Sequence, residues 1–249
     1  MGCAKTSRNT SPVSSSDCAR GIDVFSVPLD HDTSSHVIRP GIPRLIELVI
    51  SLLTLVLSAP LWATAAVLVR LTSSGAAFFS QERIGRRGQR FILYKIRTMT
   101  DNARGPAITT SGDRRVTRLG RILRKFKIDE LPQLWNVVKG DMSLVGPRPE
   151  VPEYVRLEDP LWAQVLSVRP GITDPVTIKL RDEETLLAQV QQERERYYLD
   201  VLQPYKLQGY ISYLERRSWS TDLRVLGQTL IAVVAPRNEQ QDVRRVKND

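Results

Sequence analysis

Cysteine is scarce in this 249-residue chain, and its two cysteines, Cys3 and Cys18, both lie in the polar first twenty residues. This placement argues against a disulfide framework and is typical of a protein that works in a reducing compartment. No apolar run precedes Cys3, so the beginning of the sequence lacks the hydrophobic core of a lipoprotein signal. Internal repeats are also missing, and the length suits one sizeable domain with appendages.

The chain has fewer acidic residues (27) than basic residues (36), which gives a formal net charge of +9 and a pI near 9.8. Such a charge favours anionic partners: nucleic acid, an anionic membrane surface or phosphorylated substrates. The chain shows no recognisable nucleic-acid-binding motif and carries its own apolar segment. We therefore expect no nucleic-acid partner, and favour anionic membrane lipids or a phosphorylated substrate.

Charges are nearly absent from residues 45–71, an apolar segment interrupted by Pro60. Proline kinks or breaks a helix, so two topologies are open. In the first, a single kinked helix crosses the bilayer. In the second, two half-helices enter the bilayer and return to the same side, because each is roughly 18–22 Å long and the hydrocarbon core is roughly 30 Å thick. The flanking Arg44 and Arg70 fit one interface in the second case, but residue patterns alone leave the choice even.

The remaining sequence predicts an α+β, helix-dominated protein. Residues 1–41 read as a disordered arm, 42–72 as the membrane segment, 73–235 as the main folded domain and 236–249 as a polar tail. The bases that follow the apolar segment predict that residues 73–235 lie in the cytoplasm. Two apolar runs around "GRRGQ" predict a β-hairpin, and periodic apolar residues predict amphipathic helices from Val116, from Leu131 and in "STDLRVLGQTLIAVV". The segments "KGDMSLVGPRP" and "RPGITDP" are expected to be loops.

Two adjacent acids, Asp129 and Glu130, follow a dense run of bases. Taken alone, the pair is best explained as acids that stabilise the N-terminal end of a helix. A second interpretation gives the acids separate roles, one as a nucleophile and the other as a ligand for a divalent metal, with the surrounding bases keeping both ionised. Arg148, held between Pro147 and Pro149, would present a rigid guanidinium to phosphate.

Together these features resemble the bacterial sugar transferases, the monotopic phosphoglycosyl transferases that prime glycan assembly on polyprenyl phosphate. The resemblance covers residues 42 to about 235 and is carried by the proline-broken segment, "FFSQERIGRRGQRFILYKIRTM", "DELPQLWNVVKGDMSLVGPRP" and "VRPGIT". It implies a re-entrant membrane helix with its break at Ser58 and Pro60, a small hairpin and interfacial helices. The implied location is the cytoplasmic face of a bacterial inner membrane.

The resemblance also implies roles. Asp129 would attack the β-phosphate of a UDP-sugar, release UMP and form a phosphosugar–aspartyl intermediate, which polyprenyl (undecaprenyl) phosphate then attacks. Glu130 would bind Mg²⁺. Substrate contacts are implied for six further residues: Lys95, Arg97, Pro147, Arg148, Pro149 and Arg181.

Two departures from the family pattern stand out. An alanine separates Ser58 from Pro60, where many members have Ser-Pro, and "DPVTIKLRDEE" replaces the usual stretch after "PGIT". The sequence therefore does not identify the sugar, nor the oligomeric state, which leaves a homodimer open. The alternative from another class is a non-catalytic, membrane-bound interaction protein with the same fold. The intact acid pair and Pro-Arg-Pro motif argue against it, and a UMP-release assay separates the two.

Overall fold

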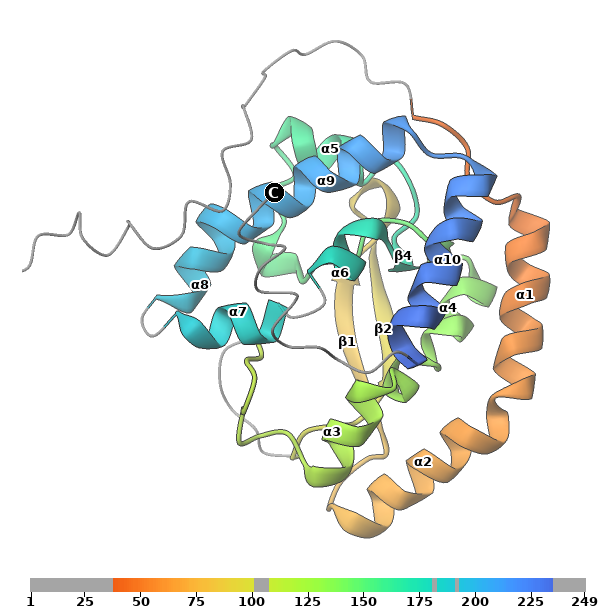
Figure 1. Ribbon diagram of the computed structural model, residues 1–249, viewed down its shortest axis with the longest axis vertical. Coiled ribbons are helices and arrows are strands. Elements are labelled where there is room, and N and C mark those ends of the chain that lie inside the picture. Colours follow the sequence, from red (N-terminus) through yellow and green to blue (C-terminus); the bar gives the residue numbers. More distant parts are fainter. Residues whose placement is uncertain (1–37, 101–107, 181–182, 191–192, 235–249) are drawn as a thin grey trace, which may run out of the picture. The chain divides into compact units, whose positions relative to one another are not determined.

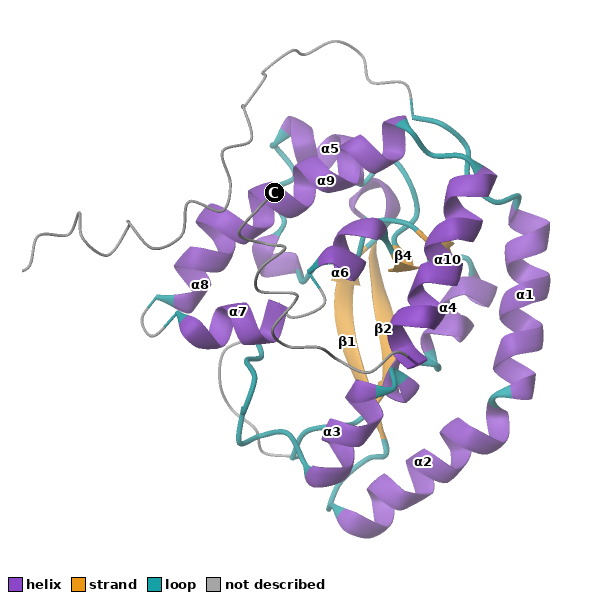
Figure 2. Ribbon diagram, in the orientation of Figure 1, coloured by secondary structure: helices purple, strands orange, loops and turns teal. Residues whose placement is uncertain are grey.

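A computed structural model describes residues 38–100, 108–180, 183–190 and 193–234, and most of these are helical (Figures 1 and 2). The helices are α1 (Arg44–Leu57), α2 (Ala59–Thr72), α3 (Arg118–Lys125), α4 (Gln133–Lys139), α5 (Pro160–Val165), α6 (Pro175–Lys179), α7 (Glu183–Gln189), α8 (Arg194–Tyr197), α9 (Gln203–Glu215) and α10 (Trp219–Val234). The strands are β1 (Phe78–Ile84), β2 (Arg90–Ile96), β3 (Ser143–Val145) and β4 (Gly171–Thr173). Short 3₁₀ turns are η1 (Arg86–Gly88), η2 (Ile128–Glu130) and η3 (Pro152–Tyr154), and a π-helical stretch, η4 (Tyr198–Leu202), joins α8 to α9. The helix-dominated α+β class and the expected hairpin are confirmed.

The apolar segment forms two helices that meet at an angle of 54° at Ser58. Pro60 has no N–H to donate to the preceding turn, so the helix cannot continue regularly through it. The Ser58 hydroxyl donates to the carbonyl of Leu55 at 3.4 Å and makes no side-chain cap for α2. No single helix in the described ranges is long and apolar enough to cross a bilayer, although this bent pair passes that test as a unit.

α1 turns two of its polar side chains toward the protein and most of its apolar side chains outward. Glu47 and Ser51 are buried, and Glu47 accepts hydrogen bonds from the hydroxyl of Ser143 and the N–H of Leu144. Four of the six leucines of α1 are instead exposed, among them Leu45 by 73% and Leu57 by 79%. An apolar outer surface of this kind indicates contact with lipid or another protein.

The β1–β2 hairpin lies centrally, as Figure 1 shows, and pairs Phe78 with Ile96 and Ile84 with Arg90. Its end at Ile96 packs with Val69 of α2 and Leu123 of α3, so the hairpin joins the apolar helix pair to α3. A second cluster packs α4, β3, α9 and α10 against the same hairpin.

The prediction of two loops at 139–149 and 169–175 was wrong in part, because β3 and β4 pair in parallel there. Ser143 lies opposite Gly171, and Val145 opposite Thr173. The backbones come so close that a Cβ on Gly171 would lie 2.1 Å from the nitrogen of Gly146. Three-residue strands are too short to show periodicity, and their pairing depends on contacts between distant parts of the chain.

Candidate active site

The acid pair lies in η2, the single turn between α3 and α4. Lys127, at the start of this turn, adopts a left-handed conformation with φ of 56°, which ends α3 and redirects the chain. Among the described residues, neither acid caps α4, which begins after Pro132 without a side-chain cap. The helix-stabilising interpretation therefore receives no support from the contacts that the structure shows.

The two carboxylates have different partners. Glu130 Oε1 accepts a hydrogen bond from Arg148 Nη2 at 2.8 Å and lies 3.6 Å from Lys127 Nζ. Asp129 is only 6% exposed, and its Oδ1 atom is buried without a hydrogen-bond partner in the described part of the chain. Glu130 is thus fixed as part of an ion pair, while Asp129 keeps an oxygen uncommitted.

The pKa values of the pair are driven in opposite directions. Burial and the neighbouring charge of Glu130 raise the pKa of Asp129, against smaller opposing effects from Lys127, Lys95 and Arg124. Burial would also raise the pKa of Glu130, but the charges of Arg148 and Lys127 outweigh it and hold that pKa far below its usual range. The expectation that the surrounding bases keep both acids ionised therefore fits Glu130 most strongly. The pKa of Asp129 rises to about 6, so its carboxyl group is mostly, but less completely, ionised at neutral pH.

The Pro-Arg-Pro loop is held in place from several sides. The N–H of Gly171 donates to the carbonyl of Pro147 at 2.9 Å, and Arg83 Nη1 donates to the carbonyl of Pro149 at 3.1 Å. Both prolines are buried, whereas the Arg148 side chain is 37% exposed and reaches Glu130. Of these three residues, Arg148 makes the polar contact with the acid pair and the prolines fix the loop.

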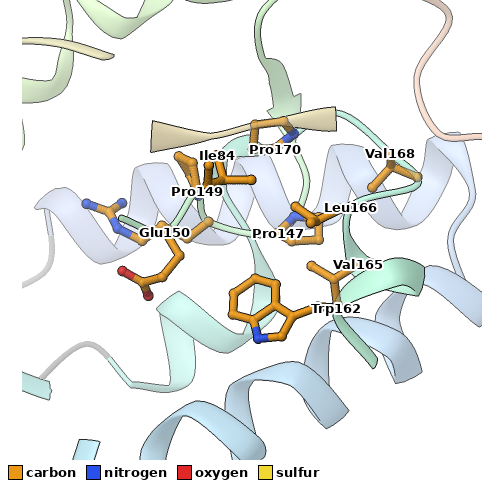
Figure 3. A pocket seen from close by; sticks show the side chains of 10 residues that line it. Ile84, Pro147, Pro149, Glu150, Trp162, Val165, Leu166, Val168 and Pro170 are labelled. Atoms are coloured by element: carbon orange, nitrogen blue, oxygen red, sulfur yellow. The ribbon is translucent and has the colours of Figure 1, made fainter. Parts of the chain in front are cut away.

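A small cavity lies on the apolar side of this loop (Figure 3). Pro147 and Pro149 face Trp162, Val165 and Leu166 there, as Figure 3 shows. Its volume of ≈ 10 Å³ holds no more than about one water molecule. The cavity cannot hold a sugar, so its role is to pack the loop.

Lys95 lies near the end of the second strand of the hairpin, and Arg97 directly follows that strand. Lys95 Nζ lies 5.0 Å from the centre of the Phe79 ring, and burial, together with the charge of Arg83, lowers its pKa to about 8. Asp129 acts in the opposite direction on that pKa, which places the ammonium within electrostatic reach of the acid pair. Two N–H groups of Arg97 donate to the carbonyls of Ser73 and Ser74, just after α2.

Three further bases belong to this region but were not predicted as site residues: Arg83, Arg124 and Lys127. The charge of Arg83 acts on Lys95, and the charges of Arg124 and Lys127 act on Asp129. Arg124 donates to the hydroxyl of Thr98 at 2.9 Å. The predicted contact residue Arg181 lies outside the described residues.

The residues present are compatible with one Mg²⁺ ion. The described ranges contain no group of three or more His, Cys, Asp or Glu side chains that could hold a metal by themselves. Mg²⁺ commonly takes only one or two protein carboxylates and completes its shell with water and substrate phosphates. The unpartnered oxygen of Asp129 beside Glu130 meets that modest requirement.

The chain is similar to known proteins along most of its length. A sequence model of the bacterial sugar transferase family matches residues 38–236. The chain is 35% identical over 238 residues to a UDP-glucose:undecaprenyl-phosphate glucose-1-phosphate transferase of Caulobacter vibrioides, covering 90% of this chain and 85% of that protein. It is also 40% identical over 133 residues to a putative undecaprenyl-phosphate N-acetylgalactosaminyl 1-phosphate transferase of Bacillus subtilis, covering 53% of this chain and 73% of the relative. The exopolysaccharide production protein ExoY of Sinorhizobium fredii is 36% identical over 164 residues, with coverage of 59% and 73%.

Proposed function

Because the chain belongs to the bacterial sugar transferase family, we propose that it transfers a sugar-1-phosphate from a UDP-sugar to polyprenyl phosphate and releases UMP. The observation that carries this proposal is the unequal acid pair, with Asp129 uncommitted and Glu130 fixed by Arg148. The names of the relatives include glucose and N-acetylgalactosamine as sugars and undecaprenyl phosphate as the lipid. Those names support the substrate classes and leave the sugar open.

In the first step of the proposed reaction, a carboxylate oxygen of Asp129 attacks the β-phosphorus of the UDP-sugar. The new bond forms as the bond from that phosphorus to the bridging oxygen breaks, and UMP leaves with the electron pair. The product is a phosphosugar joined to Asp129 as an acyl phosphate. In the second step, an oxygen of polyprenyl phosphate attacks the same phosphorus, and the Asp129 carboxylate is released.

The basic residues around the acid pair offset the negative charge of the substrates in this reaction. A diphosphate and a lipid phosphate bring several negative charges close to two carboxylates, and Arg148, Lys127 and Lys95 offset them. Glu130, with Asp129 beside it, would hold Mg²⁺, which when bound supplies charge neutralisation for the diphosphate. Burial of Asp129 removes water from its carboxylate and makes it a better nucleophile than an exposed acid.

A membrane location follows from the same proposal. The outward-facing leucines of α1 and the bend at Ser58 support a re-entrant anchor, and Arg44 and Arg70 fit a single interface. Exposed apolar residues on α3 and directly after it, Ile122 and Phe126, support a helix lying along that interface. The basic residues beyond the anchor favour the cytoplasmic face.

The test is to incubate the full-length protein with a UDP-sugar and Mg²⁺ in the absence of lipid acceptor. UMP should be released in an amount close to that of the enzyme, and mass spectrometry should find a phosphosugar adduct on Asp129. Asp129→Asn keeps the side-chain shape but removes the attacking charge, so UMP release should fall by several orders of magnitude. An adduct on another residue would reject the assignment of Asp129. No UMP release from any of several UDP-sugars would favour the non-catalytic interaction protein.

A further inference from the structure

A second group of bases surrounds a pocket at the turn of the β1–β2 hairpin. Its volume is ≈ 230 Å³, many times the space that one water molecule needs. Arg86, Arg87, Arg90 and Arg169 contribute to its lining, and Asp141 is the one acid among the lining residues. Four guanidinium groups around one hollow are costly to assemble unless an anion offsets their repulsion.

Part of this charge is neutralised within the protein. Arg90 pairs with Glu82 at 3.1 Å, and Asp141 pairs with Lys139 at 3.0 Å. The other three arginines of the pocket form no ion pair with the residues that the structure describes. The pocket therefore retains an excess of about three positive charges.

Two of these arginines are oriented by the backbone. Arg86 Nε donates to the carbonyl of Ser167 at 3.0 Å, and Arg169 Nε donates to the carbonyl of Gly140 at 2.9 Å. Each bond fixes a guanidinium by its inner nitrogen and leaves the two outer NH₂ groups without a protein partner in the described ranges. Paired outer NH₂ groups are the donors that bind phosphate most effectively.

The third arginine occupies an unfavourable backbone conformation. Arg87 has φ of 59°, in the left-handed region where glycine is usual, and its N–H donates to the carbonyl of Leu166 at 2.7 Å. Strained residues of this kind often mark functional positions. Burial, followed by the charges of Arg44 and Arg86, lowers the pKa of Arg169, which agrees with positive charge gathered here without compensation.

The pocket is separate from the acid pair. Arg90 is paired with Ile84 at one end of the hairpin, and Lys95 is paired with Phe79 five residues along the strand. At about 3.3 Å per residue, their Cα atoms are roughly 17 Å apart. Neither Asp129 nor Arg148 lines the pocket.

We propose that this arginine pocket binds a phosphate ester group as a second anion site, outside the catalytic acid pair. The position of the pocket favours the headgroup of an anionic phospholipid as the source. Gly140 lines the pocket, and a Cβ placed on it would lie 3.7 Å from Nη2 of Arg44, the first residue of α1. Under the re-entrant topology proposed above, on which this preference for lipid rests, Arg44 lies at headgroup level.

Binding is tested with the full-length protein in a neutral detergent by calorimetric titration. The probes are short-chain phosphatidylglycerol, short-chain phosphatidylcholine, inorganic phosphate and UMP. The pocket variant is Arg86→Gln with Arg87→Gly, because glycine suits the positive φ and keeps the turn. The control is Arg194→Gln with Arg196→Gln, which removes the same charge from an exposed part of α8. Arg169→Gln is a second pocket variant, and melting temperatures verify that each protein is folded.

The pocket variants should bind phosphatidylglycerol roughly tenfold more weakly than wild type, the scale of losing charge-assisted hydrogen bonds, while the control changes little. A loss confined to inorganic phosphate and UMP would keep the site and assign it to a soluble phosphate. Equal affinities of all variants for every probe would overturn the proposal. So would a parallel loss of UMP release in detergent, because the pocket would then be part of the catalytic site. Binding is measured without turnover, so a protein that releases no UMP would refute the proposed function and leave this test intact.

Discussion

Asp129 and Glu130 are neighbours in sequence, yet their surroundings give them different properties. Glu130 accepts a hydrogen bond from Arg148, and this compensates for its burial. Asp129 is buried with one oxygen unpartnered and beside a like charge. A charged group in such a position reduces the stability of the fold, and nucleophiles are often kept in this way.

The first prediction is that Asp129→Asn stabilises the protein at neutral pH while abolishing activity. Burial and Glu130 raise the pKa of Asp129 in the folded state, so folding favours the protonated acid. The resulting contribution is favourable below the pKa of the unfolded chain and is lost as the pH rises through the folded pKa. Removing the charge should therefore add on the order of 1–3 kcal/mol at neutral pH, or a few degrees in melting temperature. Thermal unfolding across pH checks this, and the gain should vanish below about pH 4, near the ordinary pKa of aspartate.

The second prediction concerns the coupling between the two acids. Glu130→Gln removes the like charge beside Asp129 and leaves Arg148 without its carboxylate partner. Both changes favour the ionised form of Asp129, so its pKa should fall. Arg148→Met should have the opposite effect, since it removes a positive charge and leaves Glu130 uncompensated. Carbon-13 NMR of labelled aspartate carboxyls, assigned by difference from Asp129→Asn, measures this without requiring activity. Identical Asp129 pKa values in the two variants would contradict the coupling.

Elements position the site through contacts that span long sequence separations. Arg83 of β1 donates to the carbonyl of Pro149 and lies 3.4 Å from Glu150, so the hairpin holds the loop that carries Arg148. Glu150 also accepts a hydrogen bond from the hydroxyl of Tyr198. The loop is therefore held by contacts with both the hairpin and η4.

The third prediction is that Arg83 is a positioning residue. Arg83→Gln should loosen the Pro-Arg-Pro loop and displace Arg148, raising KM for the UDP-sugar by roughly tenfold and lowering the melting temperature. Arg83→Lys keeps the charge but cannot reproduce the forked contacts, so it should rescue stability more than KM. Arg196→Gln serves as the control, because its ion pairs are exposed. A variant at Arg83 with unchanged KM would show that the contact with Pro149 does not set the position of Arg148.

Local patterns predicted the elements whose signal lies within one stretch of sequence. The hairpin, α3, α4 and α10 were predicted and are confirmed, because alternation or helical spacing recurs over seven residues or more. Arg83 was missed as a site residue although the register places it on the same face as Lys95, through the pairs Arg83–Phe91 and Phe79–Lys95. The β3–β4 pair and the ion pair between Arg148 and Glu130 were not predictable, since each joins segments through tertiary packing.

At the scale of the whole molecule, α1 combines an apolar outer surface with a polar inner one. Glu47 is 3% exposed and contacts β3, while Arg44 donates to the carbonyls of Val137 and Met142. These contacts attach the apolar segment to the domain that carries the acid pair. A site fixed in this way to its anchor would meet a lipid phosphate at the membrane surface, where the proposed acceptor presents it.

The last prediction is that both ends of the anchor lie on the cytoplasmic side. In a Cys3→Ser background, Cys18 reports on the N-terminal arm, and Arg196→Cys in a background without Cys3 and Cys18 reports on the exposed α8. An impermeant maleimide should label neither cysteine in intact cells and both in inverted membrane vesicles, because each half of the bent pair is too short to cross the bilayer.

Pro60→Ala sharpens this test. Alanine restores a backbone donor and removes the clash with the preceding turn, so a continuous helix of bilayer-spanning length becomes accessible. A fraction of Cys18 should then become labelled in intact cells, while the cysteine at position 196 stays protected. Labelling of Cys18 from outside with Pro60 in place would instead establish a spanning anchor. Arg44 would then lie on the opposite side from Arg70, and its contacts with Val137 and Met142 could not persist in the membrane.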